Sequence, residues 1–317
     1  MPDFTLRTYK DLIQGLQEQA FSFSPFNEFI QSKEKRIICL RHDLDALPEN
    51  SLEFAKIQAA LGIKGSFYFR AVPGSWDEGI IKEIADLGHE VGYHYEDLSF
   101  AQAKLKAEGG RQKAEGLRDE ETKGRRDNNN GPHDRTTARL QDKGFLEKEL
   151  VDIAIENFAK NLQKLREIAP VKTICMHGSP MSRWDSRLLW KYYDYHDYGI
   201  IGEPYFDINF NEVMYLTDTG RRWDGKNVAV RDKAQGSGLR AQGKENRSPI
   251  TDHRSPFPKF HSTFDIIRAA EEGKLPDKIM MTFHPQRWTD KPLPWVKELV
   301  WQNMKNVGKY FLIKVRQ

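Results

Sequence analysis

The sequence predicts an α/β protein in which strands alternate with helices around a parallel sheet. Two observations support this fold class. Short apolar runs that end in polar residues recur along the chain, and segments with helical spacing of their apolar residues separate these runs. Such alternation favours a parallel sheet, either open or closed into a barrel.

The elements follow one another in a regular order. A strand at 36–42 is followed by a helix at 51–61, which ends at Gly62 because glycine tolerates the positive φ of a helix end. A shorter helix at 77–87 ends in the same way at Gly88. Further strands are expected at residues 64–70, 89–95, 172–177 and 278–284.

Two polar segments interrupt this order. Residues 107–142 and 231–256 contain too few apolar side chains to offset the entropy lost when a chain becomes ordered. We interpret both as disordered insertions in surface loops of a main domain that spans 36–317. The longest helix is expected between them, at 145–168, and residues 1–35 are interpreted as an amino-terminal helical extension.

Composition limits the classes of function. The 49 basic and 46 acidic side chains give a formal net charge of +3, which does not support a nucleic-acid partner. Cys39 and Cys175 lie in apolar runs and form no CxxC pair, so a thiolate zinc site is not expected. We expect a cytoplasmic protein without a membrane span, because the sequence shows neither a signal-peptide core nor a long apolar run.

Metal-binding residue types recur at the carboxyl ends of the predicted strands. These residues are Asp43, Asp45, His94, Glu96, His177 and His284. We expect them to converge, because the carboxyl ends of parallel strands lie on one face. Asp43 and Asp45 point to the same side of an extended chain, where one can hold a metal while the other acts as a base. Imidazole and carboxylate ligands suit a divalent metal, with zinc as the first expectation and cobalt, nickel or manganese as alternatives.

The chain resembles the polysaccharide deacetylase (NodB-homology) family, carbohydrate esterase family 4, which folds as a distorted, incomplete (β/α) barrel. The resemblance rests on three features that come in the family's order. These are the acidic motif Asp43-Leu44-Asp45, the run Gly88-His89-Glu90-Val91-Gly92-Tyr93-His94, and the late strand that ends at His284. It covers roughly residues 36–100 and 144–290, and it makes a divergent member of this family our expectation.

The resemblance implies a role for each matched residue. Asp43 matches the family's general base, and Asp45 matches the neighbouring acid that binds the metal. His94 matches the first metal histidine, and His284 matches the general acid that protonates the departing amine. These roles imply a metal-dependent amidohydrolase of the carbohydrate N-deacetylase type.

Two departures from the family's pattern leave roles open. The family has adjacent aspartates, whereas Leu44 separates them here, so the base and the ligand can be exchanged. The family's second metal histidine would fall at Leu98, which leaves His177 or Glu96 as the third ligand, or water in its place. We favour His177 because neutral imidazole is a good ligand, although the family places near this position an arginine that contacts the base.

Three residues are candidates for substrate binding. Glu96 follows the third strand, Trp223 matches a Trp-bearing loop beside the acid histidine, and Trp288 lies near His284 in the sequence. The expected substrate is an N-acetylated sugar, namely a cytoplasmic, nucleotide-linked or lipid-linked precursor of a surface polysaccharide. Two alternatives remain: a hydrolase of another non-peptide C–N bond on the same fold, and a catalytically degenerate protein that binds a glycan or a partner.

Overall fold

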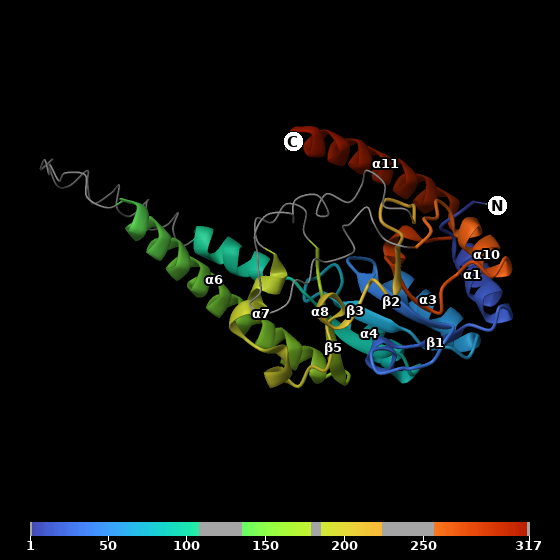
Figure 1. The fold of residues 1–317 in the computed structure, drawn as a ribbon, viewed down its shortest axis with the longest axis horizontal. Helices are drawn as coiled ribbons and strands as arrows, with labels where there is room; N and C mark the ends of the chain where they lie inside the picture. The colour runs from blue at the N-terminus through green and yellow to red at the C-terminus, as the bar shows by residue number, and fades with distance from the viewer. Residues whose placement is uncertain (1, 108–134, 179–184, 224–256, 316–317) are drawn as a thin grey trace, which may run out of the picture.

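The computed structural model of the chain is an α/β protein whose parallel sheet is flanked by helices (Figure 1). The structure describes residues 2–107, 135–178, 185–223 and 257–315. The predicted fold class is therefore confirmed at the level of an α/β protein with a parallel sheet. This arrangement is compatible with a (β/α) barrel-like fold.

Seven strands form the sheet in the described part of the chain. They are β1 (Ser22–Ser24), β2 (Ile37–Leu44), β3 (Ser66–Phe69), β4 (Glu90–Tyr95), β5 (Val171–Met176), β6 (Met214–Thr217) and β7 (Lys278–Phe283). Six of them follow the order β5-β4-β3-β2-β7-β6, and β1 pairs with β2. Every pairing is parallel, so all carboxyl ends lie at one edge of the sheet.

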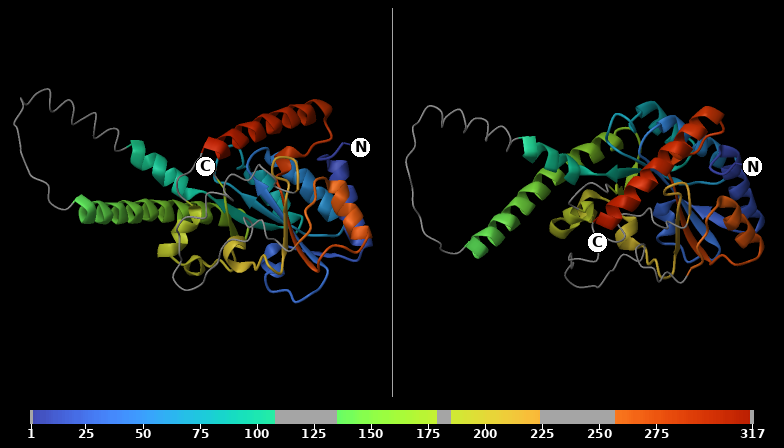
Figure 2. Two further views of the ribbon diagram at one scale, coloured as in Figure 1. Left: turned by 45° about the horizontal axis from the view of Figure 1, so that its top comes forward. Right: turned by 90° about the horizontal axis from the view of Figure 1, so that it is seen from above.

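Helices connect the strands and cover the sheet (Figure 2). The α-helices are α1 (Leu6–Glu18), α2 (Phe26–Phe29), α3 (Pro48–Ala60), α4 (Glu78–Asp86), α6 (Arg135–Arg166), α7 (Leu189–Tyr192), α8 (Pro204–Asp207), α10 (Thr263–Glu271) and α11 (Pro292–Val315). Short 3-10 helices are η1 (Ser186–Leu188), η2 (Tyr195–Tyr198) and η4 (Pro285–Arg287). In the described chain, no helix has the length and apolar character needed to cross a membrane.

The two faces of the sheet have different neighbours. On one face, alternate strand residues such as Leu40 and Phe283 join the large core with α1, α3, α4, α6 and α10. On the other face, Cys39 and Met280 pack with Phe26 of α2 in a smaller cluster. Because side chains alternate along a strand, the residues that share the second face with Cys39 are also those that build the polar site described below.

Close packing between β3 and β4 depends on one glycine. A Cβ atom at Gly92 would overlap the Tyr68 ring, so only glycine fits between these strands. The Tyr68 hydroxyl in turn lies 2.9 Å from the Thr173 hydroxyl of β5. Gly92 therefore lets β3, β4 and β5 come together and sets the position of His94, two residues further along β4.

The structure differs from the sequence-based expectations at residues 1–35. This segment contains the expected helix, α1, but β1 pairs with β2, and Phe26 packs under the sheet. The segment therefore contributes a strand to the sheet in addition to the expected helix. The reason is that Phe21, Phe26 and Phe29 are buried, which ties the segment to both cores.

The predicted insertions fall mostly outside the described residues. The segment 231–256 lies wholly outside them, as do residues 108–134 of the first insertion. Helix α6 begins at Arg135, so the last residues of the first predicted insertion, 135–142, are helical. The helix predicted at 145–168 therefore has an additional amino-terminal part.

Candidate metal centre

Three potential metal ligands meet at the carboxyl edge of the sheet. They are Asp45, which follows β2, His94 at the end of β4, and His177, which follows β5. His177 Nδ1 lies 3.2 Å from both His94 Nε2 and Asp45 Oδ1, and His94 Nε2 lies 3.8 Å from Asp45 Oδ1. The structure thus brings together the three metal ligands predicted from the sequence.

The hydrogen bond of His94 prepares its ring for metal binding. Its Nδ1 lies 2.9 Å from the carbonyl oxygen of Cys175. A carbonyl can only accept, so Nδ1 donates its proton and the lone pair of Nε2 faces Asp45 and His177. Burial lowers the pKa of His94 to about 4, which keeps the ring neutral, as a metal ligand must be.

Asp45 has a buried oxygen that lacks a conventional partner. No donor among the described residues makes a hydrogen bond of good geometry to its Oδ1, whereas Gln286 Nε2 donates to its Oδ2 at 3.2 Å. Burial raises the pKa of Asp45, but His177, His284 and His94 together lower it well below the ordinary value. A cation bound between this oxygen and the two imidazoles would neutralise the buried negative charge of the carboxylate.

The spacing of these three atoms suits a tetrahedral metal. Ligand atoms about 2.0 Å from zinc in tetrahedral geometry are roughly 3.3 Å apart. The separations found here, 3.2, 3.2 and 3.8 Å, bracket that value. The donor set of one carboxylate and two imidazoles also leaves a fourth position for water or substrate. The residues present therefore fit a divalent metal such as zinc.

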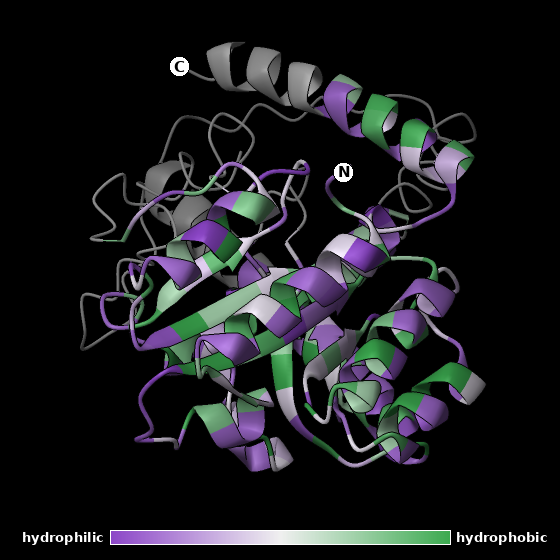
Figure 3. Cartoon of the chain, turned by 90° about the vertical axis from the view of Figure 1, so that its right-hand side faces the viewer, coloured by the Kyte–Doolittle hydropathy of each residue, from purple (hydrophilic) through white to green (hydrophobic). Residues whose placement is uncertain are grey.

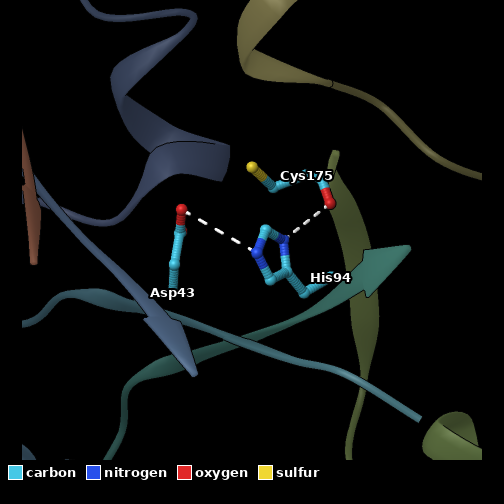
Figure 4. Close-up of side chains that lie close together, drawn as sticks. All are labelled: Asp43, His94 and Cys175. Carbon is cyan, nitrogen blue, oxygen red and sulfur yellow. Dashed lines mark hydrogen bonds and ion pairs between the residues drawn. The ribbon is translucent and has the colours of Figure 1, made fainter. Parts of the chain in front are cut away.

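A second group shares His94 with the first. Asp43, His94 and Cys175 each offer a ligand atom within 4.8 Å of the others. Figure 4 shows Asp43 on one side of the His94 ring and Cys175 on the other. Burial raises the pKa of the Cys175 thiol well above its ordinary value, and a protonated thiol is a poor ligand. The group Asp45, His94 and His177 is therefore the better candidate.

Asp43 is held by an arginine from its own strand. Arg41 Nε and Nη2 donate to the two oxygens of Asp43 at 2.8 and 2.6 Å. Burial alone raises the pKa of Asp43, but Arg41 and His94 outweigh burial and hold it well below the ordinary range. Asp43 Oδ2 also lies 3.9 Å from His94 Nε2, so an ionised carboxylate borders the metal-binding group.

Sequence reasoning missed Arg41, although a signal was present. Arg41 lies two residues before Asp43 in a strand, so both side chains point to the same side. The resemblance placed an arginine that contacts the base near His177. Arg41 makes that contact here, which leaves His177 available as a ligand.

His284 lies near the aspartates and is oriented by Asp218. Its Nδ1 lies 2.5 Å from Asp218 Oδ1, and its backbone N–H donates to Asp218 Oδ2 at 2.9 Å. Arg287 Nη1 and Trp288 Nε1 also donate to this carboxylate, at 2.9 and 2.7 Å. Burial raises the pKa of Asp218, but His284 and Arg287 outweigh it, so the group stays ionised. With Nδ1 bound to Asp218, Nε2 is the nitrogen left for a substrate.

Glu96 forms an ion pair with Arg70 and lies on the Nε2 side of the His177 ring, whereas Nδ1 of that ring faces Asp45. Arg70 Nε and Nη2 donate to Glu96 Oε1 at 2.8 and 2.6 Å, and Arg70 Nη1 donates to the Asp45 carbonyl oxygen at 3.2 Å. Glu96 Oε2 lies 3.9 Å from His177 Nε2. Leu98 is buried in the large core. The geometry thus places His177, rather than Glu96, with the other two candidate ligands.

Trp223 and Trp288 do not have the role expected from the sequence. They are 3% and 0% exposed, so neither ring offers a face to a sugar. Trp223 Nε1 donates to the Thr263 hydroxyl at 3.0 Å, and Trp288 holds Asp218. Their side chains pack in the large core beside Phe283. This corrects the substrate-binding assignment of both tryptophans.

Comparisons with family models, with curated proteins and with solved structures gave no match to this chain. The functional argument therefore depends on the residues and geometry of the site.

Proposed function

We propose that the chain is a metal-dependent hydrolase that removes an N-acetyl group from a sugar, on a (β/α) barrel of the polysaccharide deacetylase type. One observation carries the proposal. A three-residue metal-binding group, Asp45, His94 and His177, lies beside the ionised carboxylate of Asp43, and His284 is close enough to affect the pKa of both aspartates.

Asp45, His94 and His177 would hold the metal. When bound, a divalent metal supplies polarisation of the amide carbonyl and a lower pKa for water. His94 contributes Nε2 because its Nδ1 proton is committed to Cys175. Asp45 contributes Oδ1, while Gln286 fixes its other oxygen. This division of roles assigns Asp45 as ligand and leaves Asp43 as base.

Asp43 would accept the proton of the attacking water. Arg41 keeps the carboxylate ionised and fixes its orientation through two hydrogen bonds. His284 would then donate a proton from Nε2 to the amide nitrogen, because an amine anion does not leave. Asp218 holds the His284 ring so that Nε2 points away from the carboxylate. Each proton transfer typically contributes a factor of about 10² to 10⁴ to the rate.

The first test is the metal content of the purified protein, measured beside an Asp45→Ala/His94→Ala double variant. We expect near-stoichiometric zinc, cobalt, nickel or manganese in the wild type and its loss in the variant. His196→Ala is a matched control, since His196 is exposed and pairs with Asp194 away from the site. Acetate release from N-acetylated sugar nucleotides would then test the activity.

One result would exclude this mechanism. If the wild type holds no metal even after incubation with each ion, the metal-dependent deacetylase is wrong. A protein without metal that still cleaves a C–N bond would favour the alternative hydrolase. A protein with neither metal nor activity that retains a glycan would favour the binding role.

A further inference from the structure

Helix α11 turns most of its described large apolar side chains away from the rest of the protein. Figure 3 shows hydrophobic residues along the described part of this helix, which crosses the top of the view. Half of the ten large hydrophobic residues that are exposed in the described chain lie on it. They are Leu293, Val296, Val300, Trp301 and Met304, of which Leu293 is 84% exposed.

The face of α11 that contacts the protein carries both polar and apolar residues. Gln302 is 5% exposed and donates to Glu298, one turn earlier. Trp295 Nε1 donates to the Asp3 carbonyl oxygen at 2.9 Å. At about 100° per residue these side chains fall opposite Val300. The helix is thus attached by one face, and its apolar stripe has no cover from the described residues.

The exposed face of α11 also carries positive charge. Lys297 is exposed on the apolar stripe, and Lys305 is exposed at the edge of the stripe, where its Nζ lies 5.0 Å from the centre of the Trp301 ring. Glu298 is the one acidic residue in the described side chains of the helix, and it is partly buried on the attached face. An apolar stripe that includes a tryptophan and is flanked by lysines is typical of helices that lie in the plane of a membrane surface.

We propose that α11 docks the protein on an anionic lipid surface. Val300 and Met304 would enter the boundary between headgroups and acyl chains, while Lys297 and Lys305 contact lipid phosphates. A second copy of the chain suits this face less well. Pairing two copies through this stripe would cover Lys297, and the stripe has no acidic residue to neutralise it.

Helix α11 follows the same carboxyl edge of the sheet at which the candidate metal centre lies. Helix α11 begins at Pro292, eight residues after His284 at the carboxyl end of β7. Exposed Leu47 and Phe100 also follow carboxyl ends of strands, those of β2 and β4. The docking does not rest on the proposed function. If both hold, a lipid-linked sugar is the substrate class that this docking favours, because docking would hold the protein at the surface where such a sugar lies.

Sedimentation of the full chain with lipid vesicles tests the docking. We expect binding to vesicles that contain phosphatidylglycerol, little binding to phosphatidylcholine alone, and weaker binding as salt screens the lysines. Val300→Asp and Met304→Asp should each weaken binding by about tenfold or more, because a carboxylate would enter the lipid boundary. Phe206→Asp is the matched control, since Phe206 is exposed on α8.

Several results would overturn the proposal. Equal binding to neutral and anionic vesicles would contradict it, as would unchanged binding by the α11 variants. A dimer that Leu293→Asp dissociates in analytical ultracentrifugation would assign the face to a second copy. Leu293 is largely exposed, so this variant keeps the test valid if Val300→Asp does not fold. Metal content is a separate readout, so failure of the docking is distinguishable from failure of the proposed function.

Discussion

Arg41 donates one hydrogen bond to each carboxylate oxygen of Asp43, at 2.8 and 2.6 Å, from two residues earlier in the same strand. Both side chains are buried, so neither charge is stabilised by bulk water. Arg41 therefore fixes the orientation and the ionised form of the Asp43 carboxylate beside the metal-binding group without a residue from another strand. This explains how His177 can serve as a ligand at a position where the resemblance implied an arginine.

Arg41→Met should destabilise the fold by about 3–5 kcal/mol, because it leaves the buried Asp43 without a counter-charge. Urea unfolding at neutral pH measures this change. The control is the double variant Arg41→Met/Asp43→Asn, which removes both charges and should recover much of the stability but no activity. A loss below about 1 kcal/mol in the single variant would show that Asp43 is neutralised in some other way.

Asp218→Asn should reduce kcat by about 10² to 10⁴, because the ring of His284 would lose the carboxylate that orients it. His284→Gln should cause a loss of similar size, and the double variant should be no worse than either single variant, as expected for residues that act as a unit. Trp288→Phe removes one donor to Asp218 and should cost less. Additive losses in the double variant would contradict the coupling.

The carboxyl ends of the strands were the part of the site that the sequence could predict. Apolar runs located β2, β4, β5 and β7, and the polar residue at each end followed from the parallel arrangement. Convergence of Asp45, His94 and His177 needed β4 to pair with β5 and β3 to hold β2 and β4 in parallel register on either side of it. Such short-range patterns are visible in a single sequence.

The remaining parts of the site depend on contacts that a sequence does not display. Strand β6 is four residues long and was not predicted, so Asp218, which follows it, was missed. Trp223 was expected at a sugar site from its match to a Trp-bearing loop, and Trp288 from its place near His284, but aromatic residues occur both in cores and in binding sites. Which of the two applies depends on packing against Phe4 and Phe283, from distant parts of the chain.

His177→Ala should weaken zinc binding by about 100-fold or more, because it removes a direct ligand. Glu96→Gln should weaken it less, within the roughly 10- to 100-fold typical of residues behind the ligands. Titration with a competing chelator measures both dissociation constants. A second readout is thermal unfolding, since a ligand that binds only the folded state raises the melting temperature. The reverse order of effects would make Glu96 the third ligand.

Stability should fall as pH rises from about 5 to about 8, because of Glu203. Burial raises the pKa of this carboxyl from its ordinary value to about 8, despite hydrogen bonds from the Met176 and Tyr205 backbone N–H groups. The folded state therefore binds a proton that the unfolded state has released, so the stability gained at low pH is lost as the folded group ionises. The change attributable to this group is on the order of a few kcal/mol.

Urea unfolding across this pH range, compared between the wild type and Glu203→Gln, isolates the contribution of Glu203. The variant keeps a neutral side chain of the same size, so its stability should depend less on pH over the same window. The sign is decisive. A carboxylate stabilised in its charged form by Arg41 and Arg187 would instead gain stability with rising pH only below its ordinary pKa of 4.5, and would give no loss in this window. Parallel pH profiles for the two proteins would show that Glu203 does not titrate between about pH 5 and 8.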